Sequence, residues 1–172
     1  QVVFAIKCMP TQARRMIMGW GTCVGATYDF SGPRLGRWTG CCESLVQSIN
    51  SVIRSTVPSF RWGSLQINKN SISQLHSDSN NLGPSAIILV GDFIGGAFRQ
   101  ADGGCSLEQA GVGMLIDGTK PHFSEPFQGI RYSIVAFYHK ETDNLSEQEK
   151  SYLSSLGFVL AVNPPLLGDA PS

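Results

Sequence analysis

The sequence lacks the cysteine pattern of a protein held together by disulfides or by a zinc ion. Its 172 residues contain five cysteines, and no two of them form a C-x-x-C pair. An odd cysteine count without that spacing argues against a disulfide framework and against a zinc knuckle. Reduced thiols in an intracellular protein are the simpler interpretation. The cysteines are Cys8, Cys23, Cys41, Cys42 and Cys105.

Long hydrophobic runs are also absent. Apolar runs such as Ala86–Val90 and Ile134–Phe137 have the length of a β-strand, whereas a membrane-spanning helix needs roughly 20 apolar residues. No charged-then-apolar leader is visible either. We therefore expect no membrane segment.

Net charge is zero, but the two halves of the chain differ in sign. Residues 1–70 carry eight Lys/Arg and two acidic residues, and residues 71–172 carry five Lys/Arg and eleven acidic residues, so the halves are +6 and −6. Such asymmetry marks either a face that binds a polyanion or two halves that neutralise each other in the fold.

The length suits one domain with a packed core. Helical spacing of Leu45, Ile49, Val52 and Ile53 predicts a helix over Cys42–Thr56. Ser146 and Glu149 form a capping box that begins a second helix, which Gly157 is placed to end. We read Ser31–Gly36 as a loop. The remaining predicted elements are strands: Val2–Cys8, a bent Met16–Val24, Ser64–Asn68, Ile72–His76, Ser85–Val90, Gly96–Arg99, Gly113–Ile116, Arg131–Tyr138 and Phe158–Val162.

This order predicts a single α+β domain over residues 1–172, with helices flanking a jelly roll. Residues 1–63 form a supporting N-terminal part, residues 64–140 the jelly-roll core, and residues 145–162 a closing helix and strand.

Only three histidines are present, and one of them, His76, forms an H-x-D pair with Asp78. On an extended segment, residues i and i+2 point to the same face, so both side chains can reach one ion. His122 lies 44 residues after Asp78 and offers a third ligand. Two histidines and one carboxylate form the facial triad of non-haem Fe(II) oxygenases, which leaves part of the coordination sphere open for oxygen. The third histidine, His139, follows the last long strand and is expected to be exposed.

Nine residues after His122 comes Arg131, followed by Ser133 in an R-x-S pair. Alternation along the strand puts Arg131 and Ser133 on one face with Val135 and Phe137. A buried arginine needs an anion, and a dicarboxylate would supply one, with the Ser133 hydroxyl adding a bond. An internal salt bridge, or simple exposure of Arg131 on the outer face, would equally explain this residue taken alone.

The series H-x-D, H and R-x-S in this order resembles the Fe(II)- and 2-oxoglutarate-dependent oxygenases, whose core is a double-stranded β-helix. The resemblance covers roughly residues 65–138. It implies that His76, Asp78 and His122 bind Fe(II), that Arg131 holds the distal carboxylate of 2-oxoglutarate with help from Ser133, and that O2 is a cosubstrate.

Within that superfamily, the segments around His76–Ser85, Gly91–Gly96 and Asp117–His122 look most like the TET/JBP-type branch. That branch oxidises the 5-methyl group of pyrimidine bases in DNA or RNA. Asn80 and Asn81 would order the metal loop, touch substrate, or simply form the turn. A peptidyl (prolyl-type) hydroxylase and a non-catalytic jelly-roll binding module are the alternative interpretations.

Overall fold

The structure is a computed structural model that describes residues 12–14, 17–57 and 59–161. The predicted strand Val2–Cys8 lies outside the described residues. So does Val162, at the end of the predicted last strand.

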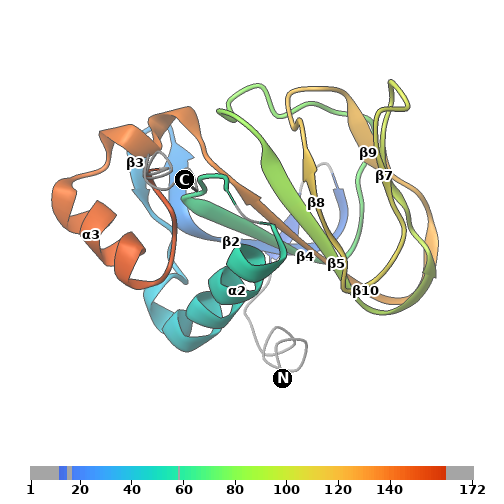
Figure 1. The fold of residues 1–172 in the computed structure, drawn as a ribbon, viewed down its shortest axis with the longest axis horizontal. Coiled ribbons are helices and arrows are strands. Elements are labelled where there is room, and N and C mark those ends of the chain that lie inside the picture. The colour runs from blue at the N-terminus through green and yellow to red at the C-terminus, as the bar shows by residue number, and fades with distance from the viewer. Residues whose placement is uncertain (1–11, 15–16, 58, 162–172) are drawn as a thin grey trace, which may run out of the picture.

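Most of the regular secondary structure in the described chain is antiparallel β-sheet (Figure 1). The strands are β1 (Gln12–Arg14), β2 (Ile17–Asp29), β3 (Gly32–Leu35), β4 (Ser64–Ile72), β5 (Ser85–Gly95), β6 (Phe98–Gln100), β7 (Ser106–Leu107), β8 (Gly113–Ile116), β9 (His122–Ser124) and β10 (Phe127–Phe137). The larger sheet has the order β1-β2-β4-β10-β5-β8, with β3 paired to β2, and the smaller has the order β7-β6-β9.

Two helices and two 3-10 turns accompany the sheets. They are η1 (Gly40–Cys42), α2 (Glu43–Thr56), η2 (Lys140–Asn144) and α3 (Glu147–Ser155). The predicted first helix is confirmed, and it buries Val46, Ile49 and Ile53. The capping box at Ser146 and Glu149 is confirmed with both of its hydrogen bonds. None of the helices in the described part of the chain has the length and apolar character that a membrane span requires.

The two faces of the larger sheet bury different hydrophobic cores. Leu65 of β4 and Ile134 of β10 belong to a core shared with α2 and α3. On the opposite face, Ile87 and Leu89 of β5 pack with Phe98 of the smaller sheet. Because side chains alternate along a strand, β5 and β10 contribute to both cores.

Strand register determines which side chains join the second face. Ser133 of β10 lies opposite Asn68 of β4 and Leu89 of β5, and Val135 lies opposite Gln66 and Ile87. Directly opposed residues share a face in an antiparallel sheet. The polar side chains Asn68 and Ser133 are therefore on the face that the smaller sheet partly covers.

Several predicted elements differ from the structure. Residues 73–76 are not part of a strand, and His76 makes only an isolated bridge. The predicted loop Ser31–Gly36 contains β3, which forms a hairpin with β2. The predicted last strand is reduced to one bridge between Val159 and Trp62. The first and third differences depend on distant partners, which decide whether an extended segment becomes a strand. The strand β3 instead pairs with the neighbouring β2 across a tight turn. The double-stranded β-helix connectivity stays a prediction.

Candidate functional site

The two predicted metal-binding histidines are joined through their backbones. His76 N–H donates to the carbonyl of His122 at 3.0 Å, and His122 N–H donates back to the carbonyl of His76 at 2.8 Å. Residues paired in this way present their side chains on the same side. The two imidazole centroids accordingly lie 4.3 Å apart, although the residues belong to the loop before β5 and to β9.

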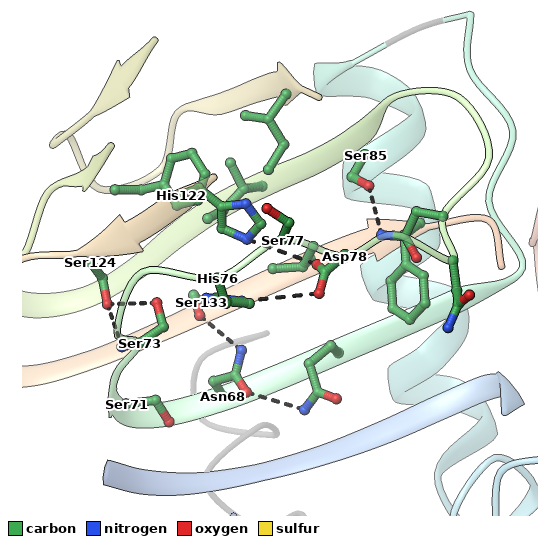
Figure 2. Close-up of a pocket in the computed structure, with 18 of the residues that line it drawn as sticks. Asn68, Ser71, Ser73, His76, Ser77, Asp78, Ser85, His122, Ser124 and Ser133 are labelled. Atoms are coloured by element: carbon green, nitrogen blue, oxygen red, sulfur yellow. Dashed lines mark hydrogen bonds and ion pairs between the residues drawn. The ribbon is translucent and has the colours of Figure 1, made fainter. Parts of the chain in front are cut away.

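Asp78 completes the cluster from the same loop. Its backbone N–H donates to the carbonyl of Gly118 at 2.8 Å, which fixes the carboxylate next to the imidazoles. Asp78 Oδ1 lies 4.0 Å from His76 Nε2, and Asp78 Oδ2 lies 3.8 Å from His122 Nε2. Figure 2 shows the three side chains converging. The His122 side chain is only 6% exposed, whereas those of His76 and Asp78 are 39% and 45% exposed, so the cluster opens on one side.

Hydrogen bonds set the tautomer of both imidazoles. His76 Nδ1 lies 2.7 Å from the carbonyl of Gln74, and His122 Nδ1 lies 2.8 Å from the carbonyl of Lys120. A carbonyl oxygen only accepts, so both Nδ1 atoms carry a proton, and Nε2 is the atom that can bind a metal. A carbonyl on the far nitrogen is the usual support for a metal-binding histidine.

The ligand atoms fit a single cation. One atom from each of His76, Asp78 and His122 lies within 4.8 Å of the other two, and the described residues contain no other such cluster. Two neutral imidazoles and one carboxylate suit a divalent transition metal, and three protein ligands leave positions free for small molecules.

The three residues line a cavity of about 350 Å³ that also contains Arg131. The Arg131 residue is 2% exposed, and burial lowers the pKa of its guanidinium to about 10. Its Nη1 donates to the carbonyl of Ser71 at 3.3 Å, and its Nε has no hydrogen-bond partner among the described residues. The rings of Phe93 and Phe127 flank it at 5.9 and 5.6 Å.

No carboxylate pairs with Arg131 among the described residues. Both simpler explanations of Arg131, an internal salt bridge and an exposed position, are thereby removed for the described part of the chain. An isolated buried cation is costly, and an anion in the cavity would offset that cost.

Ser133 lies two residues further along the same face of β10 and also lines the cavity. Its hydroxyl accepts a hydrogen bond from Asn68 Nδ2 at 3.1 Å, and Asn68 Oδ1 accepts one from Gln66 Nε2 at 3.1 Å (Figure 2). The hydroxyl proton of Ser133 is then free to donate to a ligand. Sequence reasoning missed Gln66 and Asn68, although two polar residues at alternate positions of an apolar strand are the signal that could have found them.

Two asparagines of the loop between β4 and β5 add further polar groups. Asn80 and Asn81 both line the cavity. The buried Asn81 holds the loop, because its N–H donates to the carbonyl of Asp78 at 3.1 Å and its side-chain amide to Ser85 Oγ at 3.4 Å. Asn80 contributes its carbonyl, which accepts from Lys140 N–H at 3.0 Å.

The expectation that His139 is exposed is wrong. His139 is half-buried, lines the cavity and stacks on Tyr28 with ring centroids 5.2 Å apart. Its Nδ1 accepts from Glu141 N–H at 3.1 Å, and burial lowers its pKa, so the neutral ring carries its proton on Nε2. The adjacent Lys140 misled the sequence interpretation, because only the fold shows that the chain turns at His139 into η2.

Comparisons with known proteins give a match in fold alone. No family model matches the sequence, and no curated protein matches it. Among solved structures, a 2OG-Fe(II) oxygenase family oxidoreductase from Burkholderia pseudomallei aligns with a TM-score of 0.61 and 17% identity, covering 82% of this chain and 77% of that one. A structure described as OsALKBH1 aligns more loosely, with a TM-score of 0.46 and 12% identity over 79% of this chain and 91% of that one.

Proposed function

We propose that this protein is a Fe(II)- and 2-oxoglutarate-dependent oxygenase. The observation that carries the proposal is a buried guanidinium, Arg131, that has no carboxylate partner in the described chain and shares one cavity with His76, Asp78 and His122. A fold shared with a 2OG-Fe(II) oxygenase family protein supports it.

In this proposal each residue has a defined task. His76, Asp78 and His122 hold Fe(II), and Arg131 with Ser133 holds the distal carboxylate of 2-oxoglutarate. When bound, Fe(II) and 2-oxoglutarate supply the oxidising chemistry: one atom of O2 enters succinate as CO2 is released, and the other converts a substrate C–H to C–OH. The protein positions the reactants, and apolar side chains such as Ile87 and Val135 keep water out of the cavity.

Binding and turnover test this assignment separately. Under anaerobic conditions the protein should bind Mn(II) and then N-oxalylglycine, an unreactive diacid, as followed by calorimetry. With Fe(II), 2-oxoglutarate and air it should release succinate. His76→Ala should lose both metal binding and succinate release, whereas Ser48→Ala, on the far helix α2, should keep both. A His76→Ala variant that binds Mn(II) normally would remove the assigned metal site.

We further propose that the oxidised group is the 5-methyl of a pyrimidine base in DNA or RNA, as in the TET/JBP-type branch that the motif resembles. Two donors at the cavity support this, because a pyrimidine edge presents carbonyl and ring-nitrogen acceptors. His139 Nε2 carries a proton, and the Asn81 amide lies nearby on the paired segment. The Tyr28–His139 stack adds an aromatic surface.

The substrate assay compares three kinds of probe. Oligonucleotides of DNA and RNA with one 5-methylcytosine, and proline-containing peptides, are incubated with the loaded enzyme and analysed by mass spectrometry for a gain of one oxygen. Oxidation of the methylated base supports the proposal. Oxidation of peptides alone would favour the peptidyl hydroxylase, and metal binding without any succinate release would favour a non-catalytic binding module.

A further inference from the structure

A second hollow, of about 650 Å³, lies on the larger sheet next to the metal cavity, and Arg34, Arg37, Trp38 and Gln66 are among the residues that line it. We propose that it binds the phosphate-bearing nucleotide adjacent to the base that enters the metal cavity. This inference rests on the proposed function and extends it to how the enzyme holds its substrate strand.

The two hollows adjoin each other on one face of the sheet. Gln66 lines both of them. It lies in one row of paired residues, between Val135 of β10 and Cys23 of β2. Adjacent strands are about 4.8 Å apart, so the row from β10 to β2 spans roughly 10 Å. A substrate that reaches the metal cavity with one group can therefore place a neighbouring group in the second hollow.

Gln66 forms the boundary between the hollows. Its Nε2 donates to the carbonyl of Thr22 and to Asn68 Oδ1, both at 3.1 Å. These bonds hold the amide against the sheet. A chain crossing from one hollow to the other would pass over this amide.

The charge of the second hollow favours an anion. Of the described residues, Arg34 and Arg37 are the charged ones that line it, and none of the described carboxylates does. Arg34 is paired with Asp29. Arg37 makes no ion pair among the described residues, and its guanidinium lies 5.1 Å from the centroid of the Trp38 ring. A planar guanidinium beside an aromatic ring suits a phosphate and an adjoining base.

The charge asymmetry of the sequence is consistent with this site. None of the ion pairs between described side chains joins a basic residue of the first 70 to an acidic residue of the remainder. The two halves therefore do not neutralise each other by direct contact in the described chain. Part of the excess positive charge of the N-terminal half remains available to a polyanion.

The test measures strand binding without turnover. A fluorescein-labelled single-stranded DNA with one 5-methylcytosine is titrated, at several salt concentrations, with protein loaded with Mn(II) and N-oxalylglycine. Arg37→Gln should weaken binding roughly five- to tenfold near physiological salt and reduce the salt slope by about one. Arg37→Lys should keep the slope, because it keeps the charge. Lys150→Gln removes one positive charge on α3, away from the sheet face, and should change neither quantity.

Three outcomes would overturn the inference. In the first, wild type and Arg37→Gln bind the DNA with equal affinity. In the second, Arg37→Gln weakens binding of free 5-methylcytidine monophosphate as much as it weakens binding of the DNA. In the third, the protein binds a glutamate-rich peptide in place of DNA, and that binding depends on Arg37. The second would assign the phosphate to a free nucleotide rather than to the neighbouring one. N-oxalylglycine affinity and substrate-free succinate release are measured in parallel. Arg37→Gln should leave both unchanged, whereas their absence in wild type would mean that the proposed function itself fails.

Discussion

At the scale of single residues, Arg131 lowers the stability of the folded protein but favours the binding of an anion. Its guanidinium is buried between two aromatic rings, and burial alone lowers its pKa to about 10. At neutral pH it remains charged, with Ser71 as the one hydrogen-bond partner identified for its side chain. Such a group destabilises the protein without ligand and binds an anion strongly.

Replacing Arg131 should therefore separate binding from stability. Arg131→Met should lower the affinity for N-oxalylglycine on the order of 10- to 100-fold, because charge-assisted hydrogen bonds are lost. The free energy of unfolding of the ligand-free protein, measured in urea, should stay the same or rise. The control is Arg61→Met, because the Arg61 guanidinium packs on the ring of Tyr138. This variant should leave the affinity for N-oxalylglycine unchanged. Unchanged diacid affinity in Arg131→Met would contradict the assigned role.

His139 should make stability depend on pH. Burial lowers its pKa in the folded state, so the unfolded state binds more protons between the folded value and about 6.5. Stability consequently rises with pH in that window and is lost as pH falls through it. Urea unfolding from pH 5 to 8 should show this decline in wild type and a flatter profile in His139→Gln. Parallel profiles for the two proteins would contradict the prediction.

At the scale of elements, the turn between β5 and β6 makes room for Arg131. Gly96 has a φ of +72°, and a Cβ placed there would lie 2.8 Å from Phe127 Cβ and 3.0 Å from Arg131 Cδ. The glycine pair Gly95-Gly96 thus permits both a left-handed backbone and close contact with the arginine.

Two alanine substitutions isolate this contact. Gly96→Ala should cost about 1 kcal/mol for its backbone conformation and a further 1–3 kcal/mol for overpacking, and it should weaken diacid binding. Gly103 has a similar φ of +74°, but a Cβ added there would meet no atom within 4 Å. Gly103→Ala should carry only the backbone cost and bind the diacid normally. Urea unfolding and calorimetry measure both effects, and equal losses in the two variants would show that contact with Arg131 is unimportant.

The helices were more predictable than the strands. The bounds of α2 and the capping box of α3 follow from contacts within a few residues, so local sequence predicts them well. By contrast, the sequence predicts a loop where β3 forms and a strand over residues 73–76, where none exists. The bridge from His76 to His122 depends on a partner elsewhere in the chain, whereas β3 pairs with the adjacent β2 across a turn that its Gly and Pro residues made look like a loop.

At the scale of the whole molecule, the metal cluster ties together distant segments. His76 and Asp78 lie in the loop between β4 and β5, and His122 lies on β9 of the smaller sheet. A cation bound by all three would cross-link the two sheets. Because a ligand that binds only the folded state stabilises it, metal should raise the unfolding temperature.

Thermal unfolding with and without Mn(II) checks this. At a metal concentration of 100 times Kd, wild type should gain about 2.7 kcal/mol. Asp78→Asn removes the anionic ligand and should lose most of this gain. Asp92→Asn makes the same change at an exposed position of β5 and should retain it. Equal stabilisation of both variants by Mn(II) would contradict the three-residue cluster.

The sequence alone determined the helices, the β-rich middle of the chain and the short list of residues with suitable chemistry. Residue type and spacing are local properties that the sequence shows directly. The list was short because the chain has only three histidines and few arginines in apolar strands. Only the tertiary structure decided that His76 pairs with His122, that Arg131 lacks a carboxylate, and that His139 enters the cavity. Each of these depends on contacts between segments far apart in the chain, whose register follows from packing of both sheet faces and not from any local pattern.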